Sequence, residues 1–215
     1  MRLALVSDIH ANFDALAAVA DLLESADRVV CLGDCVGYYR QVNEVLDYLR
    51  RLEPVCVLGN HDLFALTNCP PTANPAVRAG VEHAAATMTP QNRAWLGSLP
   101  AMWAGRLGGA LVLAAHGSPW RPFDDYLYAG DGRLPRLAEF EVDLVALGQT
   151  HRAFVSAEGG PRVVSPGSVG QPRDLPGSAS VVLLDTTDMD PVLVRRPVEP
   201  GDAPEGTAGP GRGEG

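Results

Sequence analysis

Histidine and aspartate side chains, with one asparagine, recur in short polar segments that each follow an apolar run of the chain. The segments are SDIH at 7–10, GDC at 33–35, GNHD at 59–62, AHG at 115–117 and GQTH at 148–151. Mixed imidazole, carboxylate and amide donors suit cations such as Mn²⁺, Fe and Zn²⁺ rather than a thiolate site. The potential metal ligands are Asp8, His10, Asp34, Asn60, His61, Asp62, His116 and His151.

The elements that must position these residues are predicted β-strands, because each polar segment lies where an apolar strand ends. In the first half, strands are expected at 2–7, 28–32 and 54–60, and amphipathic helices at 12–24 and 42–52. Apolar strands that alternate with such helices are typical of a parallel sheet covered on both faces. Ligands bind such sheets beyond the carboxyl ends of the strands. The polar segments are therefore expected to converge on one rim.

The second half of the chain is expected to form a second, more antiparallel sheet that packs on the first. Helical sequence at 75–98 precedes strands at 101–107 and 110–115, whose Gly-Gly junction is typical of a hairpin. Further strands are expected at 143–147, 152–156, 162–165, 179–185 and 191–196. Residues 198–215 are mainly Gly, Pro and Glu, so we expect a disordered tail after one domain of residues 1–197.

The composition favours a cytoplasmic protein. The formal charge is −9, from 26 acidic residues and 17 basic ones that are all Arg. This balance argues against binding to a nucleic-acid polymer, which needs clustered positive charge. No apolar stretch approaches the ~20 residues of a membrane span, and the first apolar run is too short for a signal peptide. The four cysteines form no CxxC pair and are expected to be reduced, and a homo-oligomer is left open.

A single histidine after a strand is more often a capping or surface residue than a metal ligand, so no segment carries much weight alone. Four of the five histidines, however, lie at predicted strand ends in short segments that contain Gly or Asp. The fifth, His83, lies in the helical stretch VEHAAA and is expected to be structural or exposed. The joint occurrence of the four is what favours a functional site.

In this order, the five segments resemble the sequence blocks of the calcineurin-like metallophosphoesterases. The stretches SPGSVGQPRD at 165–174 and VGYYRQVNEV at 36–45 resemble the small bacterial and archaeal phosphodiesterases of that family. The resemblance covers residues 7–174 and implies an α/β fold, a four-layer αββα sandwich with two mixed β-sheets. It also implies a hydrolase that cleaves phosphoesters with two divalent metal ions.

The same resemblance implies a role for each candidate residue. The implied ligands are Asp8, His10 and His151 for the first metal, and Asn60 and His116 for the second. Asp34 would bridge the two ions, so that a shared water loses its proton near neutral pH and attacks phosphorus. His61 would be the general acid for the leaving oxygen. Mn²⁺ is the first expectation for the metals, and Fe, Zn²⁺ and Ni²⁺ are alternatives.

Two positions depart from the family pattern. The last block of the family is GHxH, and Gln149 stands where a second-metal histidine is expected. A glutamine carbonyl oxygen is a weaker donor, so the second metal is expected to be looser, to be a harder ion, or to bind only with substrate. Gly37 and Tyr38 replace the Asp-Arg pair of the protein Ser/Thr phosphatases, which favours small substrates. Substrate phosphate contacts fall to Arg152 and Arg173, for which solvated loop arginines are the equal alternative.

The leading hypothesis is a phosphodiesterase or phosphatase that acts on a small phosphoester, a nucleotide included. Hydrolysis of a dinucleoside polyphosphate is the alternative within enzymes, because it uses the same metals in a wider groove. A degenerate, noncatalytic module that binds a metal or a nucleotide is the alternative from another class, and Gln149 is its one support. The expected partner is the substrate, with neither a nucleic-acid polymer nor a membrane.

Overall fold

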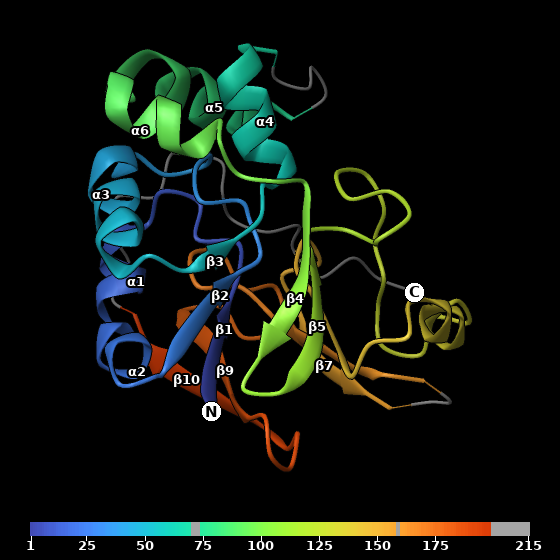
Figure 1. Cartoon of the computed structure of the whole chain (residues 1–215). Coiled ribbons are helices and arrows are strands. Elements are labelled where there is room, and N and C mark those ends of the chain that lie inside the picture. Colours follow the sequence, from blue (N-terminus) through green and yellow to red (C-terminus); the bar gives the residue numbers. More distant parts are fainter. Residues whose placement is uncertain (70–73, 158–159, 199–215) are drawn as a thin grey trace, which may run out of the picture.

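Two five-stranded β-sheets packed face to face form the centre of the protein, whose computed structural model describes residues 1–69, 74–157 and 160–198 (Figure 1). The first sheet contains, from edge to edge, β10 (Pro191–Pro197), β9 (Ser178–Asp185), β1 (Arg2–Val6), β2 (Arg28–Cys31) and β3 (Val55–Cys56). The second contains β4 (Met102–Leu107), β5 (Ala110–Ala115), β6 (Leu144–Leu147), β8 (Arg162–Pro166) and β7 (Ala153–Ser156). Apart from Val198, the predicted tail lies outside the described residues.

The first sheet is parallel where its strands come from the first half of the chain, as predicted. β1 pairs with β2 and β2 with β3 in parallel. β9 and β10, however, return to this sheet and not to the second, because β9 pairs antiparallel with β1 and β10 with β9. The expectation that both strands belong to the second sheet is wrong. β9 is buried along nearly its whole length, which requires the two-sided cover that a position beside β1 provides.

The second sheet is less antiparallel than expected. β4 and β5 form the predicted hairpin, and β7 pairs antiparallel with β8. Its centre is parallel, because β6 pairs with both β5 and β8 in the same direction. The connection from β5 to β6 contains a 3₁₀ helix, η1 (Leu134–Phe140), which the sequence pattern did not predict.

The two outer layers complete the four-layer αββα sandwich that the resemblance implies. α1 (Phe13–Ala17), α2 (Ala20–Glu24) and α3 (Val42–Leu52) cover the outer face of the first sheet (Figure 1). The predicted helix 12–24 is thus two short helices, although Asn12 is the expected N-cap and accepts a hydrogen bond from the Ala15 amide at 3.1 Å. Leucines from η1 and the preceding loop pack on the outer face of the second sheet. Apolar side chains from both sheets fill the space between them.

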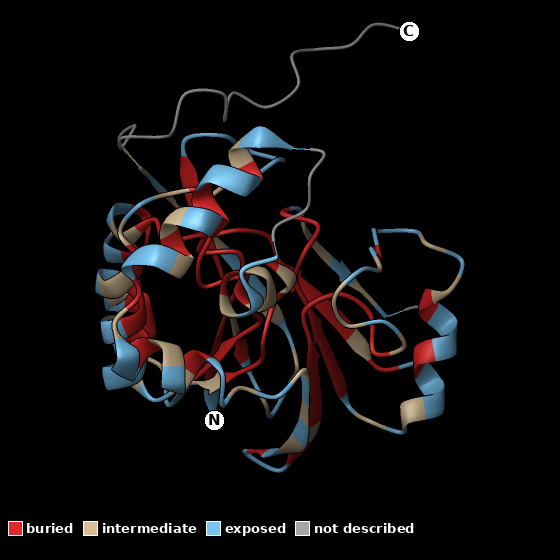
Figure 2. Ribbon diagram, turned by 90° about the horizontal axis from the view of Figure 1, so that it is seen from above, coloured by how far each residue is buried: buried red, intermediate tan, exposed pale blue. Residues whose placement is uncertain are grey.

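Three more helices lie above the carboxyl ends of the strands in the first sheet (Figure 1). They are α4 (Asn60–Thr67), α5 (Pro75–Thr87) and α6 (Pro90–Leu96). The predicted strand 54–60 is therefore too long, since α4 begins at Asn60. The predicted helical region 75–98 is two helices, because Met88 and Thr89 are extended and the Thr89 side chain caps α6. Figure 2 looks down on this end of the molecule and shows that the loops there are largely buried.

Candidate metal centre

The strand-end loops and the first turn of α4 bring four imidazoles and two carboxylates together at one rim of the sandwich. The side chains are those of Asp8 and His10 after β1, Asp34 after β2, His61 in α4, His116 after β5 and His151 after β6. All six residues are buried. Their ligand atoms form three overlapping groups, in each of which every atom lies within 4.8 Å of the others. The convergence predicted from strand ends is therefore present.

Asp34 lies at the centre of this cluster. Its Oδ2 is 3.3 Å from His116 Nε2, 3.7 Å from His10 Nε2 and 3.9 Å from His61 Nε2. Its Oδ1 accepts a hydrogen bond from the His61 amide at 2.8 Å. One carboxylate oxygen thus fixes the loop, while the other faces three imidazoles. This is the arrangement that a bridging carboxylate requires.

Asp8 and two histidines form the other side of the cluster. Asp8 Oδ1 is 3.2 Å from His151 Nε2 and 3.8 Å from His10 Nε2, and Oδ2 accepts from the Gln149 amide at 3.1 Å. Asp8 Oδ1 is completely buried and has no hydrogen-bond partner. A buried carboxylate oxygen without a donor is costly in an apo cluster, and a cation beside it would remove that cost.

Backbone carbonyls orient three of the imidazoles. Their Nδ1 atoms lie at hydrogen-bond distance from Val36 O at 3.3 Å for His10, Leu32 O at 2.7 Å for His116 and Gln171 O at 2.7 Å for His151. A carbonyl can only accept, so each Nδ1 carries a proton and Nε2 faces the cluster. The Nε2 atoms of His10 and His151 are only 3.1 Å apart. Two lone pairs repel at that distance unless a proton or a metal ion lies between them, and metal-binding histidines are oriented by such carbonyl contacts.

The protonation states fit a site for cations. Burial alone would raise the pKa of Asp34, but the nearby His116 and His61 rings outweigh it and lower that pKa. Burial lowers the pKa values of His10 and His61, so both rings are neutral near pH 7. Burial also opposes the charged form of His116, yet Asp34 raises the pKa of His116 to about 10. The proton held between His116 and Asp34 occupies a place that a metal ion can take, since metal binding displaces protons.

A layer of hydrogen bonds behind these side chains holds the loops in register. Asp62, at the start of α4, is buried and accepts from the Val36 and Gly59 amides, each at 3.0 Å. Asp62 therefore connects the loop after β2 to the start of α4. Its carboxylate does not belong to the groups of potential metal ligands. Ser168 Oγ donates to Asp8 O at 2.7 Å, so a segment far along the chain supports the first loop.

The loops reach the site through turns in the left-handed region of backbone space. Asp8, His10, Asp34, Gln149 and His151 have φ between 54° and 65°. Such conformations cost a non-glycine residue about 1–3 kcal/mol and cluster at functional sites. Glycine is needed at position 59, because a Cβ there would overlap Asp34 Oδ1 and the Asp34 amide. Four of these residues, in three loops, direct their side chains into the cluster: Asp8, His10, Asp34 and His151.

The remaining predicted residues differ in where their side chains lie. Gln149 Nε2 donates to Phe123 O at 3.2 Å, while its buried Oε1 has no hydrogen-bond partner. The guanidinium of Arg173 lies beside the Tyr38 hydroxyl and interacts with it electrostatically. The Arg152 side chain makes no hydrogen bond or ion pair with any residue in the described ranges 1–69, 74–157 and 160–198. His83 lies on α5 away from the cluster, with Nε2 3.2 Å from Arg40 O.

Tyr38 is the neighbour of the site that the sequence did not reveal. Its ring stacks on His61 with centroids 5.0 Å apart and 28° between the planes, and meets His10 edge-on at 4.8 Å. His61 Nδ1 has no hydrogen-bond partner, unlike Nδ1 of the other three rings. The contact between Tyr38 and Arg173 joins segments 135 positions apart, and no local pattern in the chain signals it.

Two other features lie outside this cluster. The buried thiols of Cys31, Cys35 and Cys56 lie within 4.8 Å of one another in the apolar core, and all four cysteines are free, as predicted.

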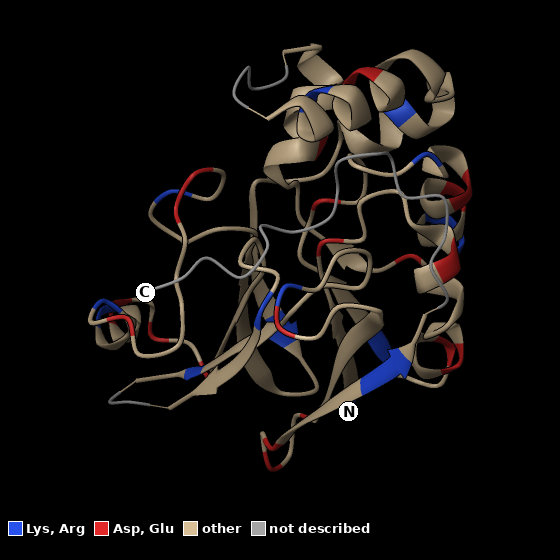
Figure 3. Ribbon diagram, turned by 180° about the vertical axis from the view of Figure 1, so that it is seen from behind, with Lys and Arg blue, Asp and Glu red and all other residues tan. Residues whose placement is uncertain are grey.

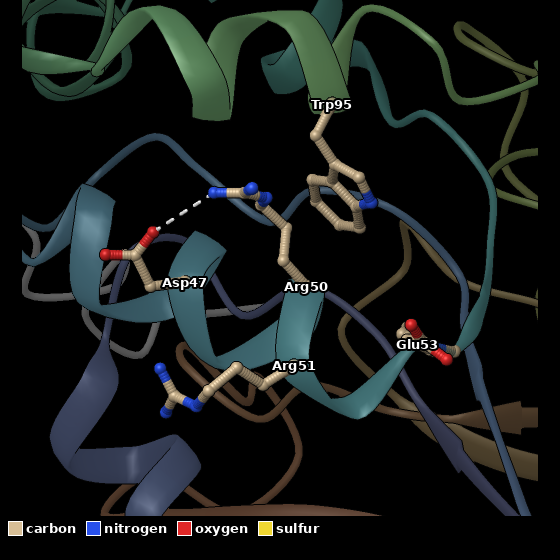
Figure 4. Close-up of a pocket in the computed structure, with 6 residues that line it drawn as sticks. Asp47, Arg50, Arg51, Glu53 and Trp95 are labelled. Carbon is tan, nitrogen blue, oxygen red and sulfur yellow. Dashed lines mark ion pairs between the residues drawn. The ribbon is translucent and has the colours of Figure 1, made fainter.

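A surface hollow between α3 and α6 is lined by charged side chains and Trp95 (Figure 4). Arg50 in that hollow pairs with Asp47 at 3.6 Å, so it joins helix residues and has no ligand of the cluster beside it. Arginine positions are scattered over several elements (Figure 3).

Comparisons with known proteins identify the family of the chain and related folds. A family model of the calcineurin-like phosphoesterase superfamily domain matches residues 1–189. The uncharacterized protein MJ0912 of Methanocaldococcus jannaschii is 29% identical over 211 residues, covering 90% of this chain and 86% of that protein. A metallophosphoesterase structure from Sphaerobacter thermophilus is 27% identical with a TM-score of 0.76, covering 93% of this chain and 90% of that one.

A second solved structure shows the same fold at lower identity. The hypothetical protein PH1004 from Pyrococcus horikoshii OT3 has a TM-score of 0.77 at 20% identity and covers 92% of this chain and 88% of that one. Within residues 1–69, 74–157 and 160–198, none of the helices is both long and apolar enough to traverse a lipid bilayer.

Proposed function

Because the chain belongs to the calcineurin-like phosphoesterase superfamily, whose members use divalent metals, we propose that it hydrolyses a small phosphodiester or phosphomonoester with two such ions. The observation that carries the proposal is the facing pair of Nε2 atoms in His10 and His151, 3.1 Å apart beside the unpaired Asp8 Oδ1. These three potential ligand atoms repel one another unless a cation lies between them, and this supports a cation site at this place. The unit that carries this activity is residues 1–197, through the end of β10.

The ligand atoms divide between two positions that share Asp34. The proposed sets are Asp8, His10 and His151 at the first, and Asn60, His116 and Gln149 at the second. His116 Nε2 lies 3.0 Å from Asn60 Oδ1, so both atoms would face one cation once the proton on Nε2 is displaced. Mn²⁺ is the proposed ion, with Fe, Zn²⁺ or Ni²⁺ as alternatives that the same donors accept. Two bound ions would lower the pKa of a water and neutralise charge on the phosphoryl oxygens.

His61 and Arg173 complete the proposed machinery. No carbonyl engages His61 Nδ1, whereas a carbonyl fixes the ring of each proposed histidine ligand. This difference leaves His61 available as the proton donor to the leaving oxygen, with Nε2 facing the cluster, once an anionic substrate beside the ring offsets the effect of burial and favours its protonated form. The proposed contact to a phosphoryl oxygen is Arg173, whose guanidinium interacts with Tyr38, the residue that stacks on His61. Arg152 is the second candidate for this contact.

Chelation is expected to abolish activity, and Mn²⁺ is expected to restore more of it than Mg²⁺. Four imidazoles line the site, and imidazole binds Mn²⁺ better than it binds Mg²⁺. The measurement is hydrolysis of bis(4-nitrophenyl) phosphate after EDTA treatment and readdition of each ion, against a blank of metal without protein. Full turnover in excess EDTA would contradict a metal-dependent mechanism. No turnover with any ion would favour a noncatalytic binding module.

Gln149→His is expected to tighten the weaker metal by about tenfold, the scale on which changes around a metal usually act. An imidazole is a stronger donor than the amide oxygen, which is buried and has no hydrogen-bond partner. The measurement is calorimetric titration of Mn²⁺, with metal per chain counted, on the wild type, Gln149→His and Gln149→Ala. The alanine variant should weaken the same step, and neither variant should change the tighter one. Identical titrations for all three would place Gln149 outside the metal shell.

A further inference from the structure

The segment 117–133, between β5 and η1, runs directly beside the candidate metal centre. Phe123 O accepts the hydrogen bond from Gln149 Nε2, and the Gly117 amide donates to Pro122 O at 2.8 Å. A Cβ on Gly117 would lie 2.7 Å from Asp125 O, so the segment packs in contact with the residue that follows His116. Residues after Asp125 therefore start from the edge of the site.

The two residues on either side of Leu127 present tyrosine rings to solvent. Leu127 is 2% exposed and packs in the core with Leu134 and Leu137. Tyr126 and Tyr128, the residues before and after it, are both exposed. They are 41% and 43% exposed, and their rings are parallel to within 10° at a centroid distance of 6.2 Å. The segment buries one apolar side chain and leaves an aromatic pair accessible.

Arg133 braces this segment in one conformation. Its guanidinium donates to both carboxylate oxygens of Asp125, to Asp131 Oδ2 at 2.7 Å and to Tyr126 O at 2.9 Å. Hydrogen bonds on both sides of the tyrosines fix the backbone that carries them. A preformed aromatic surface loses little conformational entropy when a ligand stacks on it.

The tyrosine pair and the phosphate-binding side of the site are neighbours. Asp125 O lies against Gly117, the residue that follows His116, and Tyr126 is the next residue of the segment. Phe123 O, in the same segment, accepts a hydrogen bond from Gln149 Nε2. A substrate with its phosphorus at the metals would have one substituent directed along Tyr126 and Tyr128.

We propose that Tyr126 and Tyr128 form a stacking platform for a nucleobase, so that the substrate is a nucleoside phosphodiester. The proposal rests on the phosphoesterase function proposed above and names its substrate class. Aromatic side chains stack on any base through its π-face, and each stack is worth about tenfold in affinity or more. A stacking surface next to a proposed phosphoester site fits one molecule that carries both an anionic phosphate and a flat ring.

The test compares two substrates with the same leaving group, thymidine 5′-(4-nitrophenyl) phosphate and methyl 4-nitrophenyl phosphate, with Mn²⁺ present. The wild type should prefer the thymidine ester in kcat/KM. Tyr126→Ala and Tyr128→Ala should each lower this preference, the ratio of the two kcat/KM values, by about tenfold. Tyr126→Phe and Tyr128→Phe keep the rings and should retain the ratio. Val192→Ala is the control, since Val192 is 59% exposed on β10.

Each result separates the platform from the underlying chemistry. If the alanine variants keep the wild-type ratio, or the wild type has no preference, the platform is refuted while hydrolysis stands. If neither ester is cleaved, the proposed function fails. Calorimetric binding of thymidine 5′-monophosphate to the wild type and Tyr126→Ala then tests the platform without turnover. Weaker binding by the variant supports it, and equal binding refutes it.

Discussion

Asp34→Asn is expected to lower kcat/KM by on the order of a thousandfold or more, because a bridging carboxylate contributes several kcal/mol through the metals it holds. The amide is neutral and cannot balance two cations. Asn can still accept the hydrogen bond from the His61 amide through its oxygen, so the loop keeps its anchor. The expected losses are therefore in metal binding and rate, with the fold retained. Steady-state kinetics, metal content and far-ultraviolet circular dichroism are the measurements.

The control for this variant is Asp27→Asn. Asp27 accepts from the Arg2 amide at 2.7 Å and lies before β2, at the opposite end of the strand from Asp34. It changes the net charge by the same amount without touching the cluster, and should leave kcat/KM within about twofold, as surface substitutions usually do. Near-normal rates for Asp34→Asn would mean that its carboxylate only anchors the turn before α4. The two-metal assignment would then fall with it.

His61→Ala is expected to lower the rate by about 10²–10⁴-fold for substrates with basic leaving groups, the range in which general acid catalysis acts. The loss should be much smaller for 4-nitrophenyl esters, since 4-nitrophenolate leaves without a proton. Metal content should be unchanged, because the three carbonyl-oriented imidazoles remain. The measurement is a Brønsted plot of kcat against leaving-group pKa for the wild type and the variant.

Two outcomes would contradict that role for His61. Equal losses across the series of leaving groups would show that the side chain does not deliver a proton. Loss of a metal from the His61→Ala variant would show that His61 is a metal ligand. His61 Nε2 is close enough to the cluster for that role, since it lies 3.9 Å from Asp34 Oδ2. Tyr38→Phe is the matched control, because the ring that stacks on His61 is retained and only the hydroxyl beside Arg173 is lost.

The convergence of the site could be predicted from the sequence because it depends on strand ends. Apolar strands ending at Asp8, Asp34 and His116 belong to parallel pairs, and parallel strands all end at the same rim. Side-chain identity and strand direction were sufficient to predict that these side chains converge. The family model confirms the family that the sequence blocks indicated. The fold class, an αββα sandwich, follows from the same blocks.

Pairings between distant segments could not be predicted in the same way. Nothing local tells β9 to pair with β1, since an apolar strand suits either sheet. The extent of the strand ending near Asn60 was also overestimated, because PVCVLG is apolar enough for a strand while Asn60 starts a helix. Arg152 and Arg173 both follow the site segments as loop arginines, so the sequence does not distinguish them. The tertiary fold brings Arg173 to Tyr38.

The pairing of β9 with β1 has a consequence for how the chain matures on the ribosome. β1 acquires its second neighbour only when residues 178–185 have been made, and the Asp8 loop gains its support from Ser168 at nearly the same stage. Contacts between such distant positions form slowly, because a long loop must close first. The nascent chain therefore carries β1 with one open edge, a template for aggregation, until β9 has been made. Formation of β9, not synthesis of the ligands themselves, is the event that completes the support of the centre.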